Sequence, residues 1–450
     1  MNDVEFRFLG FNAYYLHNIY FSEQTRDQID HVFETAAVNG IRVIRTWAFH
    51  ESNDFKNQSA IRKSPYYYSE YALQGLDFVV KRAKDFGIRL ILVLANNNAE
   101  YGGIQQYIEW ANLYHSDTVR NFTHADFFSD PEIKSWYKDY LNILLNRVNI
   151  YTGISYKDEP AVMSFELMNE AQAPGLDFNI ILNWYKEMSR YFKNIDTNHL
   201  LTTGEIGYDS GTERYSDLTM FYNSSGFLFN GYYGTSYFNN SSLPGIDYTT
   251  FHLYPEAWQL DAIAGNTWIK DHIMIADDLG KPALLGEFGT RENKEKFYRD
   301  YFQMLNMNDC KAAIVWNYIP PKLSYMNDPY SFNEITNAEL FSLFSEFVNQ
   351  IDSVCTDALP EIIASLEQNY PNPFNPSTTI KYSLKEAAFI KLELFNIAGD
   401  RIAVLDEGIR KAGNHMANLS FDMNVLASGV YIYRLITGNV ILTKKFILLK

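Results

Sequence analysis

Cysteine is almost absent from this chain, which has only Cys310 and Cys355 among its 450 residues. A disulfide framework is therefore excluded as the basis of the fold. We expect both residues to be free thiols, with a single bridge between them as the less favoured alternative. A hydrophobic content of 47% predicts instead an ordinary buried core.

Long apolar runs are missing as well. No stretch reaches the roughly 18 apolar residues of a membrane-spanning helix, and the first residues lack the basic and then apolar pattern of a signal peptide. Residues 1–5 run almost directly into a strand-like segment at 6–11. We therefore expect no membrane span, and a mature form from which a signal peptide has been removed.

Positive charge is scarce, because 38 Lys and Arg stand against 54 Asp and Glu, a formal net charge of −16. An acidic surface repels nucleic acids and anionic membranes, which argues against both as partners. A neutral polymer remains compatible with this charge.

Aromatic residues, in contrast, are abundant at 16%, with 33 Tyr and 32 Phe. Most are expected to fill the core. Others lie in surroundings rich in Asn, Gly and Ser, such as residues 221–240, and are candidates for flat surfaces on which sugar rings stack.

Up to residue 352, short apolar runs alternate with longer amphipathic stretches, which is typical of βα units. The expected strands are residues 6–11, 43–46, 90–94, 162–166, 200–204, 248–252, 283–287 and 312–316. The expected helices include residues 28–39, 72–86, 133–151, 182–195, 268–279 and 292–307. Eight units predict an α/β fold, a (β/α)8 TIM barrel spanning residues 1–352. A long insertion at 207–245 is expected over its active face.

The character of the chain changes after residue 352. Residues 353–366 are interpreted as a linker, and Pro371, Pro373 and Pro376 then exclude a helix or a central strand. Short alternating runs follow, separated by turns. Residues 367–450 are therefore predicted to form a small all-β, immunoglobulin-like sandwich.

Two apolar, strand-like runs each deliver a carboxylate at their carboxyl end. Glu170 follows the fourth expected strand and Glu287 ends the seventh. The carboxyl ends of barrel strands meet at one rim, so the two side chains are expected to converge. Cleavage of a glycosidic bond needs such a pair, because one acid protonates the leaving oxygen while the other attacks or activates water.

The same rim is expected to carry other polar and aromatic side chains. These are Arg45 on the second strand, Asn169 beside Glu170, His252 and Tyr254 after the sixth strand, and Trp316 at the end of the eighth. Each of them alone has an ordinary structural explanation. Core packing alone does not readily produce all of them together at five of the eight strand ends.

These residues resemble glycoside hydrolase family 5, and within it the endo-β-1,4-mannanases. The resemblance rests on segments 10–16, 43–49, 96–98, 101–103, 168–170, 203–205, 252–255 and 286–289, and on Trp258. It covers about the first 350 residues. It implies a retaining enzyme that needs no metal or cofactor, with a β-mannan polysaccharide or oligosaccharide as its substrate.

The resemblance also assigns roles. It implies that Glu170 is the general acid/base and Glu287 the nucleophile, which Arg45 and Tyr254 keep ionised. It places Asn169 at the sugar 2-hydroxyl, His252 near the acid/base, and Trp316 under the sugar at the cleavage point. Asn97, Trp47 and Trp258 are further substrate-binding candidates, although both Trp residues have packing as an equal alternative.

One position departs from the family pattern. Mannanases of this kind usually carry Trp after the paired Asn of the third strand, but Asn98 and Ala99 follow here. One aromatic sugar contact is therefore expected to be missing.

The C-terminal region carries a second resemblance. Residues 366–380, 394–399 and 426–433 are similar to the C-terminal sorting domain of type IX secretion substrates. This implies that the tail binds the secretion machinery and directs the enzyme to the cell surface or outside a Gram-negative cell. A carbohydrate-binding or linker-stabilising sandwich is the alternative.

The sequence thus predicts a secreted, retaining endo-β-1,4-mannanase. Another family 5 activity, such as a β-1,4-glucanase or an exo-β-mannosidase, is the first alternative. A non-catalytic glycan-binding surface protein is the second. The preferred mannan, the number of subsites and the oligomeric state are not determined at this level.

Overall fold

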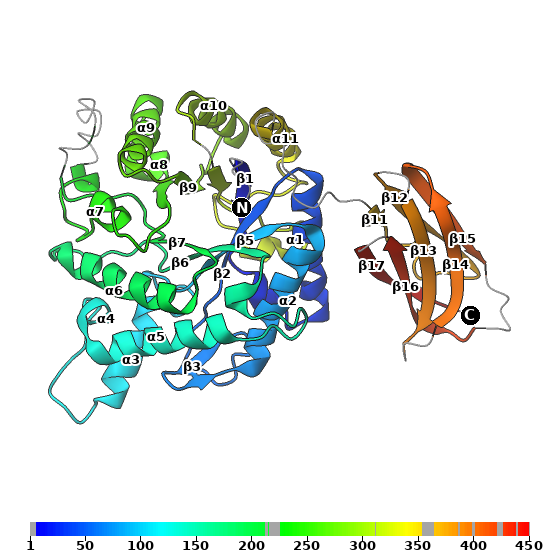
Figure 1. Cartoon of the computed structure of the whole chain (residues 1–450), viewed down its shortest axis with the longest axis horizontal. Helices are drawn as coiled ribbons and strands as arrows, with labels where there is room; N and C mark the ends of the chain where they lie inside the picture. Colours follow the sequence, from blue (N-terminus) through cyan, green and yellow to red (C-terminus); the bar gives the residue numbers. More distant parts are fainter. Residues whose placement is uncertain are drawn as a thin grey trace. The chain divides into compact units, whose positions relative to one another are not determined.

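The computed structural model describes residues 6–211, 215, 226–310, 312–352, 364–385, 388–397, 401–420, 426–437 and 440–449. The chain divides into two compact units, residues 1–357 and 358–450. Each unit has its own buried core and is described by itself (Figure 1).

The first unit contains one sheet of eight parallel strands, which confirms the predicted TIM barrel. The strands are β1 (Phe8–Asn12), β2 (Val43–Trp47), β5 (Arg89–Val93), β6 (Val162–Glu166), β7 (Leu200–Thr202), β8 (Thr249–Leu253), β9 (Ala283–Phe288) and β10 (Ala312–Val315). Their order is β7-β6-β5-β2-β1-β10-β9-β8. All residues of β1 and β2 are buried, as expected of strands covered on both faces.

Helices surround these strands (Figure 1). They include α1 (Glu23–Val38), α2 (Glu70–Phe86), α3 (Gly103–Tyr114), α5 (Pro131–Asn146), α6 (Asn179–Ile195), α9 (Ala262–Asp278), α10 (Lys294–Met307) and α11 (Ala338–Asp352).

The helix boundaries expected from the sequence are found at two of these helices. At the start of α5 the Asp130 side chain accepts the backbone N–H groups of Glu132 and Ile133 at 2.9 and 3.2 Å, and Pro131 is the first helical residue. Gly87 ends α2 at a φ of 67°, where glycine is favoured. The helix expected at 133–151 stops at Asn146, because Arg147 is extended.

Side chains join the two ends of the strand order, β7 and β8. The Thr202 hydroxyl donates to the backbone oxygen of Tyr248 at 2.8 Å. The backbone N–H groups of Gly204 and Glu205 donate to the Thr250 hydroxyl at 3.2 and 3.1 Å. The carboxyl end of β7 is thereby held against β8, which brings their rim residues into one site.

The insertion at 207–245 is described only in part, since residues 212–214 and 216–225 lie outside the described ranges. Asp209 anchors the rest. It accepts the Ser236 hydroxyl at 2.7 Å and the Tyr215 hydroxyl at 3.0 Å, and the short helix α7 (Tyr237–Ser241) follows. The position of the whole insertion over the active face stays a prediction.

The second unit consists of two antiparallel sheets. β11 (Ala364–Leu366), β12 (Ser377–Leu384) and β15 (Gly413–Ser420) form one, and β14 (Arg401–Arg410), β13 (Ala388–Asn396), β16 (Gly429–Thr437) and β17 (Val440–Leu448) form the other. Ile380, Leu392, Tyr433 and Phe446 are completely buried between them. The all-β prediction is confirmed.

One detail of the predicted linker differs. Ala364 to Leu366 pair with β12, so the last three residues of the segment 353–366 belong to the sandwich. The alternation of a short edge strand is too brief to be detected in the sequence. The rest of the segment, with Cys355, lies outside the described residues.

Two further expectations meet the structure here. Cys310 is buried and its Sγ donates to the backbone oxygen of Ala312 at 3.4 Å, while Cys355 lies outside the described residues, so the expected free thiols stay a prediction. Among the helices in the described part of the chain, none has the length and apolarity to cross a membrane.

Candidate active site

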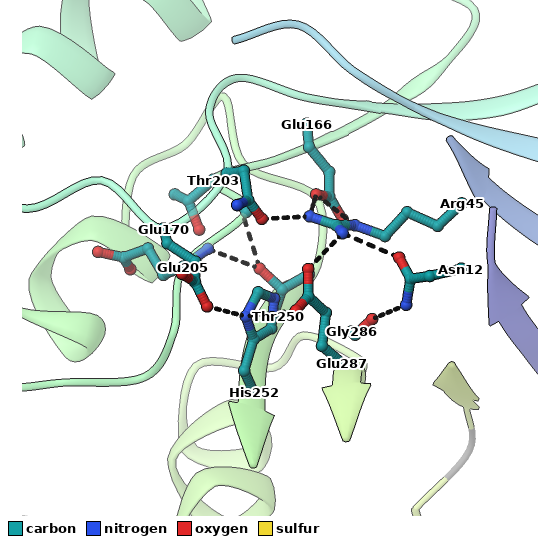
Figure 2. Close-up of polar contacts among 12 residues, drawn as sticks. Asn12, Arg45, Glu166, Glu170, Thr203, Glu205, Thr250, His252, Gly286 and Glu287 are labelled. Atoms are coloured by element: carbon teal, nitrogen blue, oxygen red, sulfur yellow. Dashed lines mark hydrogen bonds and ion pairs between the residues drawn. The ribbon is translucent and has the colours of Figure 1, made fainter. Parts of the chain in front are cut away.

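Glu170 and Glu287 converge at the carboxyl ends of β6 and β9 (Figure 2). One carboxylate oxygen of each and one ring nitrogen of His252 all lie within 4.8 Å of one another. Glu170 has a φ of 54°, which is uncommon for a residue with a side chain. Its backbone N–H donates to the Gly204 oxygen at 2.8 Å, and this bond helps to hold the residue at the rim.

Arg45 of β2 lies at the centre of the site and is completely buried. Its Nη1 donates to Glu287 Oε1 at 2.6 Å and to Asn12 Oδ1 at 2.9 Å. Its Nη2 donates to Asn169 Oδ1 at 2.8 Å, and its Nε donates to Glu166 Oε2 at 2.9 Å. Burial alone lowers the pKa of Arg45, but Glu166 and Glu287 more than reverse this effect and raise it. Arg45 is therefore a fixed positive charge.

Both oxygens of Glu287 accept hydrogen bonds. Oε1 accepts from Arg45, and Oε2 accepts the Tyr254 hydroxyl at 2.7 Å. Burial raises the pKa of Glu287, while His252, Arg45 and Tyr254 oppose that rise. Hydrogen bonds to the charged form favour ionisation, so these partners support a carboxylate that can act as a nucleophile.

Glu170 has fewer partners that favour its charged form. Burial raises its pKa to about 7, with Arg45 acting against the rise. Its Oε1 lies 2.8 Å from His252 Nδ1. Burial also lowers the pKa of His252 to about 4, so this imidazole is neutral at neutral pH and adds no full positive charge. Glu170 can therefore remain protonated near neutral pH and serve as an acid.

The two Asn candidates differ in their surroundings. Asn169 is buried and is oriented by Arg45 and by Asn96, whose Oδ1 accepts from Asn169 Nδ2 at 3.1 Å. The Oδ1 of Asn97 instead accepts the backbone N–H of Gln172 at 3.0 Å and lies 3.1 Å from His124 Nε2. This oxygen of Asn97 supports the loop after Glu170, so its substrate role stays a prediction.

The three Trp candidates also separate. Trp316 is partly exposed, and its Nε1 donates to Asp328 at 3.2 Å. Its ring stacks on Tyr14 with centroids 5.5 Å apart and planes 6° apart. Trp47 and Trp258 are only 4% and 6% exposed and contact other aromatic rings. Packing is therefore the better supported role for these two.

Sequence reasoning missed several residues that hold the site. Asn12 donates through Nδ2 to the Gly286 oxygen at 3.2 Å, and Glu166 contacts Arg45. Asp328 holds the Trp316 ring. The one available signal was an acidic or amide side chain inside an apolar strand, as at Glu166 and Asn12.

Glu205 belongs to segment 203–205 of the family resemblance, which assigned it no role. It is buried after β7 and accepts the Thr235 hydroxyl and Asn240 Nδ2, both at 2.6 Å. Burial raises its pKa to about 7. It joins the insertion to the barrel.

A parallel eight-stranded barrel that brings a buried and a partly buried carboxylate, differently stabilised, together at one rim is the arrangement that a glycoside hydrolase requires. Comparison with known proteins identifies the family. Residues 12–309 match the family described as GH family 5 beta-mannosidase-like. This is more than half of the chain, which therefore belongs to that family. Residues 368–449 match the secretion system C-terminal sorting domain, as predicted.

Relatives and solved structures agree with this assignment. The chain is 35% identical to mannan endo-1,4-beta-mannosidase 4 of Solanum lycopersicum over 341 residues, covering 71% of this chain and 81% of that protein. It is 31% identical to mannan endo-1,4-beta-mannosidase 3 of Arabidopsis thaliana, covering 77% and 86%. The endo-1,4-beta-D-mannanase of Thermotoga petrophila has a similar structure, with a TM-score of 0.69 at 31% identity over 77% of this chain and 100% of that chain.

Proposed function

We propose that this glycoside hydrolase is a secreted, retaining endo-β-1,4-mannanase that cleaves internal bonds of mannan, glucomannan or galactomannan. The observation that carries the proposal is the close approach of Glu170 and Glu287, with carboxylate oxygens within 4.8 Å. Retaining enzymes place their two carboxyl groups about 5–5.5 Å apart, whereas inverting enzymes leave room for a water between them.

The proposed reaction is a double displacement. Glu287 attacks the anomeric carbon while Glu170 gives its proton to the leaving oxygen, and a glycosyl ester forms on Glu287. Esterification removes the negative charge of Glu287, so the pKa of Glu170 falls. Glu170 then takes a proton from the water that attacks the anomeric carbon, which releases the sugar and restores both carboxyl groups.

The surrounding side chains support these steps without a metal or a cofactor. Arg45 is a fixed cation 2.6 Å from Glu287 and favours its ionised form. Tyr254 donates to the other oxygen of the same carboxylate and orients it. Asn169, oriented by Arg45, is the proposed partner of the sugar 2-hydroxyl, and Trp316 the proposed surface under the sugar ring.

The substrate assignment rests on the relatives, whose names describe mannan endo-1,4-beta-mannosidases. The sorting domain at 368–449 supports export, with the secretion machinery as a second partner. The acidic surface, with a net charge of −16, is compatible with a neutral mannan.

Hydrolysis of galactomannan, glucomannan and carboxymethyl cellulose, measured side by side, tests the substrate. Activity on cellulose but not on mannan would instead support a β-1,4-glucanase. Release of mannose alone from mannohexaose would support an exo-β-mannosidase, and no hydrolysis of any of them a glycan-binding protein. Proton NMR of the first products tests the mechanism, because the proposal requires retention and an initially inverted anomer contradicts it.

A further inference from the structure

Glu166 contacts Arg45 on the side of the guanidinium away from Glu287 (Figure 2). Its side chain is completely buried, and its Oε2 lies 2.9 Å from Arg45 Nε and 2.8 Å from Arg45 Nη2. The guanidinium thus lies between two carboxylates. One of them, Glu287, belongs to the reaction, and the other does not touch it in the mechanism derived above.

The fold makes room for this second carboxylate. Gly204 has a φ of 84°, and a Cβ atom there would lie 2.3 Å from the Met168 oxygen and 3.2 Å from Glu166 Oε2. A glycine is therefore required for the backbone after β7 to pass close to Glu166. The Oε1 atom of Glu166 is buried and has no hydrogen-bond partner among the described residues. Among the described residues, the Glu166 carboxylate therefore forms its hydrogen bond and its ion pair with Arg45.

We propose that Glu166 is a positioning residue of the reaction, which fixes the Arg45 fork and shares its positive charge with Glu287. This inference rests on the proposed double displacement. Two contacts to Nε and Nη2 fix the plane of the guanidinium, which leaves Nη1 aimed at Glu287 and Nη2 at Asn169. Without Glu166 the Nε edge of the guanidinium loses its hydrogen bond, so the fork can tilt relative to Glu287 and Asn169.

Charge sharing sets how strongly Arg45 acts on the catalytic pair. Groups that face this cluster from the neighbouring elements include Asn12 from β1, Asn169 and Glu170 after β6, His252 and Tyr254 from β8 and its end, and the phenols Tyr185 and Tyr248. Burial raises the pKa values of both phenols well above their ordinary range, and His252 is neutral. Arg45 is therefore the single full positive charge among these named groups, and it lies close to the carboxyl groups of Glu166, Glu287 and Glu170.

Neutralising Glu166 should lower the pKa values of both catalytic carboxyl groups. If Glu166 loses its charge, the attraction of Arg45 for Glu287 and Glu170 is no longer offset by a neighbouring anion. Both carboxyl groups then ionise at lower pH. Loss of protons from Glu287 sets the acidic limb of the activity profile, and loss of the proton from Glu170 sets the basic limb, so both limbs move to lower pH.

The test measures kcat and kcat/KM of the full chain on mannohexaose from pH 4 to 9, with thermal unfolding of each variant. For Glu166→Gln we expect both limbs about 0.5–1 pH unit lower and kcat about tenfold lower. For Glu166→Asp, which keeps the charge but is shorter, we expect a lower kcat with unchanged limbs.

A matched control removes a buried carboxylate from another arginine of the barrel. Asp77 of α2 is completely buried and lies 2.9 Å from Arg147 Nε and 2.8 Å from Arg147 Nη2. Asp77→Asn should lower the unfolding temperature without moving either limb. Folded Glu166→Gln with unchanged limbs overturns the proposal, as does a limb shift of the same size in Asp77→Asn.

Two further outcomes are decisive. If Glu166→Gln does not fold, the result for Glu166→Asp decides. A kcat equal to that of the unchanged protein contradicts the positioning role. A reduced kcat with unchanged limbs of the pH profile supports it. If the unchanged protein cleaves cello-oligosaccharides and not mannohexaose, the proposed substrate fails. The same profiles measured on the cleaved substrate then test Glu166 separately.

Discussion

The barrel and the sandwich each contain a buried glutamate that contacts arginine, but the ratio of carboxylates to guanidinium groups is reversed between them. At the barrel rim a single guanidinium, that of Arg45, contacts two carboxylates, Glu166 and Glu287. In the sandwich a single carboxylate, that of Glu393, contacts Arg434 at 2.9 Å and Arg401 at 3.0 Å.

The pKa shifts follow this balance. Burial with too few cations raises the pKa values of Glu170 and Glu287. Hydrogen bonds from Arg434 and Arg401 lower the pKa of Glu393. A carboxyl group whose pKa is about 7, as that of Glu170 is, can give and take a proton near neutral pH, whereas a carboxylate that two arginines keep ionised, as Glu393 is, serves to join neighbouring strands. The comparison therefore separates a reactive site from a structural one.

The largest expected effect is at the catalytic pair. Glu170→Ala or Glu287→Ala should lower kcat on mannan by about 10³-fold or more, because each step needs both groups. Circular dichroism and thermal unfolding should show an intact fold. Glu393→Ala is the matched control in the sandwich and should leave kcat unchanged. Near-normal hydrolysis by either catalytic variant would contradict the assigned roles.

A smaller effect is expected at Tyr254, which stabilises the charged form of Glu287 without reacting. Tyr254→Phe removes one hydrogen bond to that carboxylate, so the pKa of Glu287 should rise and the acidic limb of kcat/KM should move to higher pH. The expected loss in kcat is about tenfold. The basic limb belongs to Glu170, whose pKa is about 7, and activity should fall as pH rises through that region in both proteins. A shift of the acidic limb to lower pH would show that Tyr254 does not favour ionisation.

In the sandwich the expected change is one of stability. Glu393 has a lowered pKa in the folded state, so its contribution is present above its unfolded pKa and is lost as the pH falls through its folded pKa. Glu393→Gln should lower the unfolding temperature of this unit by about 3–5 °C at pH 7. The difference from the unchanged protein should shrink on acidification. A calorimetric scan that shows an equal difference at pH 7 and at pH 3 would exclude this electrostatic explanation.

The smallest expected effect comes from removing the sandwich. A chain ending after residue 357 should hydrolyse soluble mannan within about twofold of the full chain, since each unit has its own core and every site residue lies in the first. Loss of folding on truncation would show that the barrel depends on the second unit. The reactive and structural roles would then not be separable.

The sequence by itself determined the layout of this protein. The alternation of apolar runs predicted eight strands, and the strand count placed Glu170 and Glu287 on the fourth and the seventh. Proline spacing and short alternating runs predicted the second unit. These features are local, since each depends on residues a few positions apart, and local patterns are what periodicity and turn chemistry report.

Only the tertiary structure decided how the site is charged. Arg45 meets Glu166 across 121 positions and Glu287 across 242, and no local pattern records such pairs. The burial of each residue is also not given by the sequence. The structure shows that Trp47 and Trp258 are buried, which favours a packing role for them, and that burial raises the pKa of Glu170. The barrel brings distant strand ends together and removes water from them, so the strength and sign of each interaction depend on the folded surroundings.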